Sequence, residues 1–218
     1  MHQLTKFYIL LLLAVVVAGS IFALQFTRAK KISVKPADIP ILSEGYYNIV
    51  SDEDDQILGN PGAAITITIF SDLSCADCKQ KYNEVATFVR EHPQDVRLIL
   101  KHTPRPGLFF KTNDLPQRSA FCAGKQGKYW EYVDILNGEK QSTKENALTA
   151  IADNLKLNTV SWWQCVNSEQ SKQKINYQIA QSQSLGIETL PAIYINNKRI
   201  NLENDINLVE ILTKFIAK

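Results

Sequence analysis

The stretch ITITIFSDLSCADCK, residues 65–79, decides the fold because an apolar run leads through two cysteines into a helix-like segment. Isoleucines alternate with threonines at the start of the run, which is the period of a β-strand. Cys75 and Cys78 then stand where an expected helix over residues 79–90 begins. A strand that passes through a Cys-x-x-Cys pair into a helix indicates a redox protein.

The position of Cys75 explains its expected chemistry. At the N-terminus of a helix, unpaired N–H groups and the helix dipole favour a thiolate, so the pKa of the Cys75 thiol falls and Cys75 is the predicted nucleophile. One turn later, Cys78 is placed to attack a mixed disulfide on Cys75, which makes it the resolving thiol. Half of a zinc site and a purely structural pair are the alternatives, but zinc usually takes closely spaced ligand pairs. The remaining candidates are scattered singly: His2, His92, His102, Cys122 and Cys165.

Further strands and helices follow from the periodicity. The helix after the cysteines has an apolar face that includes Tyr82, Val85 and Phe88, and a His-Pro pair ends it. Residues 96–100 form the next expected strand. A strand, a helix and a strand in this span predict a parallel pair with a right-handed crossover, which places the cysteines at the carboxyl end of a central strand.

Composition places the chain among ordinary globular proteins with an appendage. Its 218 residues are 45% apolar with a net charge of +2, which suits one modest domain with a substantial core. We find no basic stripe interleaved with aromatic residues, so no nucleic-acid partner is expected.

The appendage is the uncharged segment over residues 7–26, which has about the length that a helix needs to cross a bilayer. We expect an uncleaved membrane anchor, with a signal peptide cleaved near residues 18–20 as the alternative. Basic residues are more numerous after the segment than before it, which favours a cytoplasmic C-terminal side. The isolated cysteines instead favour an oxidising compartment, and we expect the rest of the chain to be exported.

The sequence therefore divides into an anchor over residues 1–27, a tether over 28–58 and a catalytic domain over 59–218. Within the tether, residues 46–50 are a candidate first strand, and the acidic run over 51–55 is expected to remain solvated.

Three blocks in order carry a resemblance to a known family. GNP at residues 59–61 followed by ITITIFSDLSCADCK, then AFCAGKQGKYWEY at 120–132, and GIETLPAIYIN at 186–196 resemble the bacterial DsbA-like branch of the thioredoxin superfamily. The resemblance implies an α/β thioredoxin fold with an α-helical domain inserted at about residues 113–185. The expected helices of the insertion are 117–124, 128–137, 144–155 and 160–184, the last one broken; a hairpin of 192–196 and 199–201 and an amphipathic closing helix follow.

The resemblance also implies roles for four residues outside the Cys-x-x-Cys pair. Pro191 would follow a cis peptide bond, and Leu190, where the branch often has threonine, would pair its backbone with an extended substrate. Cys122 and Cys165 would form a structural disulfide that staples the insertion. Two free thiols or a second redox relay are the alternatives.

Two departures from the family concern acids. Ile69 occupies the position where relatives commonly place a buried acid for proton movement, so water, Asp72 or Asp77 would have to substitute. The alternative to a role in proton transfer is that Asp72 caps or orders the turn and that Asp77 is a solvated carboxylate in the first turn of the helix. Asp77 also stands where strong oxidants of the family have histidine; because a carboxylate repels a thiolate, we expect a milder oxidant.

The aromatic residues within 127–132 are expected to pack the insertion against the core or to line a substrate groove. His102 is expected in an exposed loop after a strand, with a position near the active site as the alternative. The leading hypothesis is an exported, membrane-tethered thiol-disulfide oxidoreductase of the bacterial inner membrane, with its catalytic domain in the periplasm or outside the cell. Its expected partners are exported proteins with cysteines and a membrane oxidase or reductase resembling DsbB, and no cofactor is expected. The alternatives are an isomerase or reductase of the same fold and an anchored, chaperone-like binding module.

Overall fold

The computed structural model describes residue 6 and residues 47–106, 112–138, 142–200 and 208–216. The chain divides into two compact units, residues 1–35 and 36–218, and the second contains the sheet. Within the described residues, no helix has both the length and the apolar character that crossing a membrane requires. The expected anchor over residues 7–26 lies outside the described residues.

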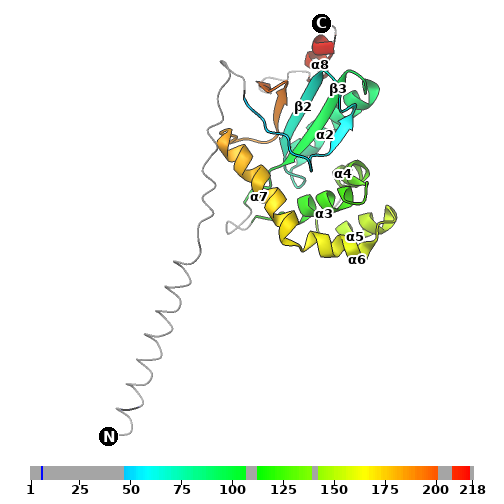
Figure 1. The fold of residues 1–218 in the computed structure, drawn as a ribbon, viewed down its shortest axis with the longest axis vertical. Coiled ribbons are helices and arrows are strands. Elements are labelled where there is room, and N and C mark those ends of the chain that lie inside the picture. The colour runs from blue at the N-terminus through cyan, green and yellow to red at the C-terminus, as the bar shows by residue number, and fades with distance from the viewer. Residues whose placement is uncertain (1–5, 7–46, 107–111, 139–141, 201–207, 217–218) are drawn as a thin grey trace. The chain divides into compact units, whose positions relative to one another are not determined.

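A five-stranded mixed sheet with the order β1-β3-β2-β4-β5 forms the centre of the fold (Figure 1). The strands are β1 (Ile57–Gly59), β2 (Ile65–Ser71), β3 (Val96–His102), β4 (Ala192–Ile195) and β5 (Lys198–Ile200). β2 is the central strand, parallel to β3 and antiparallel to β4, which confirms the position predicted for it.

Each face of the sheet packs in its own hydrophobic cluster. Ile67 and Ile69 of β2 pack with α2 (Ala76–Glu91) in the larger cluster. On the other face, Phe70 packs edge-on against Tyr194 of β4, with ring centroids 5.8 Å apart. Both faces of β2 are therefore covered, as its nearly continuous burial requires.

Helix α2 begins three residues earlier than the apolar periodicity predicts because Cys75 is its N-cap residue. Its buried side includes Tyr82, Val85 and Phe88, as the apolar spacing predicts. His92 caps the other end by donating its N–H to the Phe88 oxygen at 3.0 Å, and Pro93 follows.

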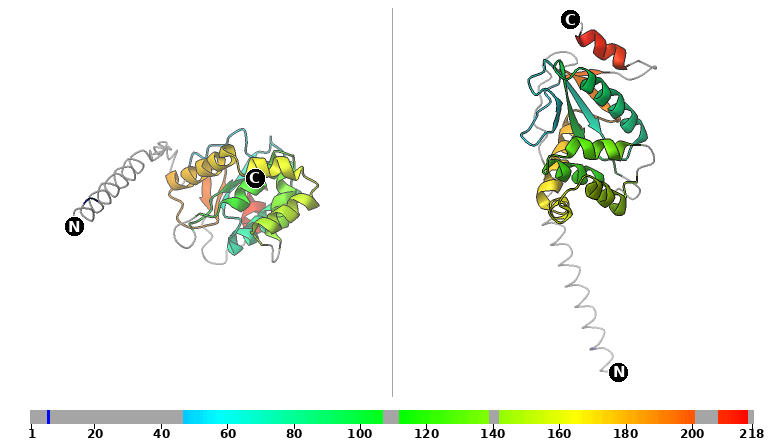
Figure 2. Two further views of the ribbon diagram at one scale, coloured as in Figure 1. Left: turned by 90° about the horizontal axis from the view of Figure 1, so that it is seen from below. Right: turned by 90° about the vertical axis from the view of Figure 1, so that its right-hand side faces the viewer.

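The helices that come between β3 and β4 in the sequence lie together beside one end of the sheet (Figures 1 and 2). Those described there are α3 (Leu115–Gly124), α4 (Tyr129–Asn137), α5 (Glu145–Asn154), α6 (Thr159–Val166) and α7 (Glu169–Ser184). The break expected within residues 160–184 falls at Ser168, whose side chain caps α7 by accepting the Ser171 N–H. After the hairpin of β4 and β5, α8 (Leu208–Ile216) packs on α2.

The segment before the sheet differs from the sequence-based expectation. Residues 47–50 form no strand, and the first described strand is β1, which pairs antiparallel with β3. Tyr47 donates a single backbone hydrogen bond to Asn197 at 2.8 Å. The pattern over residues 46–50 was apolar enough for a strand, but its described part packs against the Phe70 face through Tyr47 and Ile49 instead.

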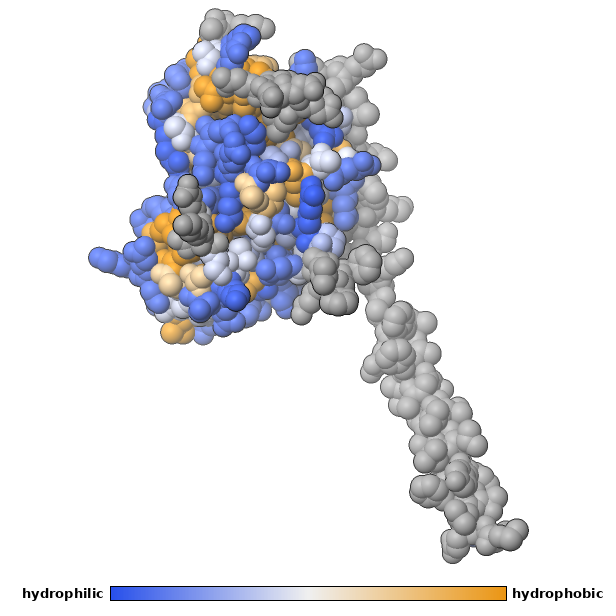
Figure 3. Space-filling model, turned by 180° about the vertical axis from the view of Figure 1, so that it is seen from behind, coloured by the Kyte–Doolittle hydropathy of each residue, from blue (hydrophilic) through white to orange (hydrophobic). Residues whose placement is uncertain are grey.

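Polar and charged residues cover much of the molecular face shown in Figure 3. Among the described residues, the large hydrophobic side chains that are exposed lie in different segments: Val50, Val160, Tyr177 and Val209.

Candidate active site

Cys75 and Cys78 form a disulfide at the N-terminus of α2, with their Cα atoms 5.2 Å apart. The Cys75 Sγ accepts a hydrogen bond from the backbone N–H of Cys78 at 3.2 Å. Cys75 is partly exposed, whereas Cys78 is fully buried. Cys75 is therefore the more accessible of the two cysteines, and it lies where a helix N-terminus favours a thiolate.

The turn that delivers Cys75 to the helix is organised by Asp72. The backbone oxygen of Asp72 accepts the Cys75 N–H at 3.0 Å, and its carboxylate accepts the Ser74 N–H at 2.8 Å. The same carboxylate accepts hydrogen bonds from the Gln117 side chain at 2.9 Å and from the Arg105 N–H at 3.0 Å. Of the two arrangements expected for Asp72, the contacts favour the one in which it orders the turn.

Leu190 and Pro191 lie at the same end of the sheet as the cysteines, next to the carboxyl end of the central strand β2. β4 begins at Ala192, which pairs with Phe70 near the carboxyl end of β2, and Cys75 follows β2 directly. The Leu190–Pro191 peptide bond is cis, and both residues are partly exposed. The strand pairing thus brings together two segments that are far apart in the sequence.

Asp77 and Lys79 occupy different environments on either side of Cys78. Asp77 is exposed in the first turn of α2. Lys79 is partly buried, which lowers the pKa of its amino group, and its Nζ donates to the Leu136 backbone oxygen at 3.0 Å. Among the described residues, no cluster of three or more His, Cys, Asp or Glu side chains is placed to hold a metal ion.

A second disulfide joins Cys122 of α3 to Cys165 of α6, with Cα atoms 5.8 Å apart. Cys122 is buried in the hydrophobic core, and Cys165 is partly exposed and packs against it. The bond links two helices of the segment that connects β3 to β4 in the sequence, and the two cysteines are 43 positions apart.

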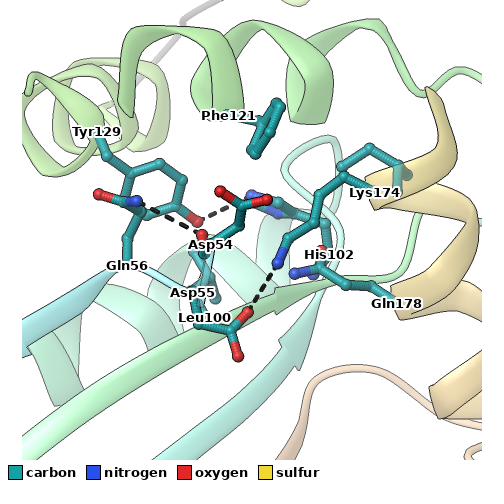
Figure 4. A pocket seen from close by; sticks show the side chains of 10 residues that line it. Asp54, Asp55, Gln56, Leu100, His102, Phe121, Tyr129, Lys174 and Gln178 are labelled. Carbon is teal, nitrogen blue, oxygen red and sulfur yellow. Dashed lines mark hydrogen bonds and ion pairs between the residues drawn. The ribbon is translucent and has the colours of Figure 1, made fainter. Parts of the chain in front are cut away.

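The acidic run before β1 is partly buried, contrary to expectation. The Asp55 side chain is only 2% exposed, and it accepts a hydrogen bond from Lys101 of β3, whose side chain is fully buried. Lys174 of α7 binds the same carboxylate at 3.1 Å (Figure 4) and also pairs with Asp52. Burial alone would raise the pKa of Asp55, but the charge and hydrogen bond of Lys101 hold it below its usual value. We name these four residues the charged cluster.

His102 is buried at the end of β3, so the prediction of an exposed loop histidine was wrong. Its Nε2 shares a hydrogen bond with the Tyr129 hydroxyl at 2.9 Å, and both residues line the small pocket of Figure 4. Its backbone N–H donates to the Gln178 side chain at 2.9 Å. Burial lowers the pKa of His102 to about 3, so the ring is neutral at neutral pH.

Sequence reasoning missed His102, Gln117 and the charged cluster. A signal existed for His102, because it continues the alternation of Leu98 and Leu100 and so belongs on the same buried face of β3. A weaker signal for the charged cluster was Lys101, a lysine near the end of a mostly apolar strand. Its partner Asp55 is 46 residues away, and no local pattern connects the two.

These observations fit a thioredoxin fold, and a thioredoxin family model matches residues 51–216. The chain belongs to the thioredoxin family. The match covers most of the chain and includes the Cys-x-x-Cys pair, the helices between β3 and β4, and the cis-proline segment. The resemblance to the DsbA-like branch is confirmed at the level of family and fold.

Solved structures show the same thioredoxin-family fold. A thioredoxin-like oxidoreductase from Silicibacter pomeroyi is 24% identical, with a TM-score of 0.65 over 75% of this chain and 91% of that one. The thiol-disulfide exchange protein alpha-DsbA2 from Wolbachia pipientis is 19% identical, with a TM-score of 0.64 over 76% and 87% of the two chains.

Curated relatives with a similar segment are much longer proteins. The Na(+)/H(+) antiporter NhaA of Herminiimonas arsenicoxydans is 21% identical over 181 residues, which are 83% of this chain and 28% of that protein. The chain therefore spans less than a third of the length of this relative.

Proposed function

We propose that this protein is a thiol-disulfide oxidoreductase that exchanges disulfides with cysteines of exported proteins through Cys75 and Cys78. The observation that carries the proposal is the pairing of a partly exposed Cys75 with a fully buried Cys78 at a helix N-terminus. The partly exposed Leu190 and Pro191 support it, because they lie at the same end of the sheet as the cysteines, where an extended substrate would pass.

In the oxidising direction, a substrate thiolate attacks the Cys75 sulfur and forms a mixed disulfide, while Cys78 leaves as a thiolate. A second substrate thiolate then attacks the substrate sulfur of that bond, so the substrate disulfide forms and Cys75 leaves as a thiolate. Two electrons have passed from the substrate to the Cys75–Cys78 pair. In the reducing direction, the Cys75 thiolate attacks a substrate disulfide and Cys78 resolves the mixed disulfide.

Protons released or taken up by the thiols exchange with water, and Asp77 is the acid that we assign to this exchange. Asp77 is exposed in the first turn of α2, whereas the Asp72 carboxylate already accepts hydrogen bonds from Ser74, Arg105 and Gln117. The exposed position gives Asp77 the freer access to solvent protons.

We place the enzyme on the outer side of a bacterial inner membrane, held by residues 7–26. Uncharged residues throughout that segment support an anchor, and the disulfide between Cys122 and Cys165 supports an oxidising compartment. A membrane oxidase or reductase would then renew the pair, and cysteine-containing exported proteins would be its substrates.

A trapping experiment tests the exchange. A peptide whose two cysteines are joined by a disulfide is incubated with reduced wild-type protein and with the reduced Cys75→Ser and Cys78→Ser variants, and the products are identified by mass spectrometry. We expect turnover only with the wild type, and a mixed disulfide through Cys75 to accumulate in Cys78→Ser. Turnover by Cys75→Ser at the wild-type rate would reject the proposal.

The direction of exchange is tested in cells by alkylation of free thiols. A mostly oxidised pair supports an oxidase, and a mostly reduced pair supports an isomerase or reductase. If cells that carry Cys75→Ser retain full function, the binding-module alternative replaces catalysis.

A further inference from the structure

We propose that Asp72, held in place by Gln117 of α3, is a positioning residue for Cys75, and that its charge adjusts the reactivity of the Cys75 thiolate. The proposal deepens the function proposed above and rests on it. Neither Asp72 nor Gln117 has to contact the substrate, because both act through the backbone and the electric field around Cys75.

The Asp72 carboxylate connects three separate segments. Its Oδ1 accepts the N–H of Ser74 in the active-site turn and the Nε2–H of Gln117, at 2.8 and 2.9 Å. Its Oδ2 accepts the N–H of Arg105, in the loop after β3, at 3.0 Å. The backbone oxygen of the same residue accepts the Cys75 N–H. The turn that ends in Cys75 is thereby attached both to the loop after β3 and to a helix that lies between β3 and β4.

Burial makes these contacts consequential. Asp72 is 8% exposed and Gln117 is fully buried, so hydrogen bonds lost here are poorly replaced by water. An alanine at position 72 would remove the acceptor for three N–H groups at once. Gln117 matters because its amide group donates to the same carboxylate oxygen that holds Ser74.

The turn determines how Cys75 presents its sulfur. Cys75 has an extended backbone with φ of −95° and ψ of 127°, which lets its Sγ cap the helix through the Cys78 N–H. A turn without its Asx hydrogen bond samples other conformations, and the sulfur then spends less time in the capped position. We therefore expect the rate of exchange to fall when Asp72 loses its acceptor oxygens.

The charge of Asp72 has a second, separable effect. When the disulfide is reduced, Cys75 becomes a thiolate in a residue whose backbone N–H is bonded to Asp72, and like charges in neighbouring residues destabilise each other. Removing the charge stabilises the reduced protein, so the disulfide becomes a stronger oxidant. The field of a buried group is screened less by salt than that of an exposed one.

The Asp72→Asn variant separates charge from positioning. Its Oδ1 still accepts from Ser74 and Gln117, while only the Arg105 contact is lost. We expect the equilibrium with glutathione to shift about tenfold towards reduced protein, which corresponds to about 30 mV. The shift should persist in about 1 M potassium chloride, with a fall in the Cys75 pKa and turnover within about threefold of wild type.

The Asp72→Ala and Gln117→Leu variants test positioning. Rates are compared at a pH where Cys75 is fully ionised, so that a change in its pKa does not contribute. We expect the exchange rate to fall about tenfold or more in Asp72→Ala and less in Gln117→Leu, with Asp72→Asn restoring it. The matched control is Gln178→Leu, which removes an equally buried glutamine that bonds the His102 backbone instead; it should lose stability and keep the exchange rate.

The proposal is overturned if Asp72→Asn keeps the wild-type potential and Gln117→Leu exchanges as fast as Gln178→Leu, since Asp72 would then act only on stability. Asp72→Asn and Gln117→Leu decide the matter even if Asp72→Ala does not fold. A wild-type protein without exchange activity would instead reject the proposed function. An active wild type with unchanged variants rejects only this inference.

Discussion

The active-site edge, residues 72–78, and the packed region behind it contain the same kinds of residues with different partners. At the edge, a disulfide joins Cys75 and Cys78 within one turn, and Asp77 faces solvent. In the packed region behind it, a disulfide joins the buried Cys122 to the partly exposed Cys165, and the Asp55 side chain is enclosed with Lys101 and Lys174. Burial and partners, rather than residue type, decide whether a cysteine or an aspartate serves reactivity or stability. We therefore expect interior substitutions to change the free energy of unfolding and edge substitutions to change exchange.

The largest expected effect is that of Asp55→Ala. It leaves the fully buried Lys101 with Asp52 at 3.9 Å as its remaining described carboxylate partner. We expect the free energy of unfolding in urea to fall by about 3 to 5 kcal/mol. The matched control is Asp54→Ala, because Asp54 pairs with Lys125 at the surface and should contribute less than about 1 kcal/mol. Equal losses in the two variants would contradict the contrast between buried and exposed aspartates.

Next in size is the removal of the Cys122–Cys165 disulfide. A double alanine variant should lower the free energy of unfolding by about 2 to 4 kcal/mol, because the unfolded chain regains the freedom that a long loop closure removes. Exchange activity per folded molecule should stay unchanged, measured with the peptide substrate after correction for the folded fraction. A double variant that loses exchange while keeping its stability would reverse the roles of the two disulfides.

Acid should weaken the interior through His102. Its pKa is about 3 when folded and near 6.5 when unfolded, so the unfolded chain takes up the proton first. Stability is fully present above about pH 6.5 and is lost as the pH falls towards 3, by up to about 1.4 kcal/mol per pH unit. Urea unfolding at several pH values should show a steeper loss in wild type than in His102→Gln. Parallel curves would mean that His102 does not titrate on unfolding.

The smallest expected effect is that of Asp77→Asn at the edge. Removing an exposed carboxylate near Cys75 should lower the thiol pKa and make the disulfide a stronger oxidant by about twofold to threefold in the equilibrium constant, while stability changes by less than about 0.5 kcal/mol. Most of this shift should disappear in about 1 M salt because exposed charges are screened. A shift that salt leaves intact would place Asp77 with the buried charges.

The parts of the fold that follow local rules were predictable from the sequence. Alternation predicted β2, the apolar spacing and the His-Pro pair predicted α2, and the cysteine spacing placed both sulfurs at the helix N-terminus. The broken helix within residues 160–184 and the final hairpin also carry local signals, in a capping serine and in turn-forming asparagines. Each of these features depends on residues a few positions apart.

Contacts between distant segments were decided only by the tertiary structure. Asp55 meets Lys101 across 46 residues, Asp72 meets Gln117 across 45, and Asp52 meets Lys174 across 122. From the sequence alone, an acidic run is expected to be solvated, because burying several carboxylates is costly. The distant lysines that offset this cost cannot be identified from the local sequence. The local sequence could therefore place the reactive sulfurs, whereas the burial of His102, the charged cluster and the attachment of the active-site turn to α3 depended on how the sheet and helices pack.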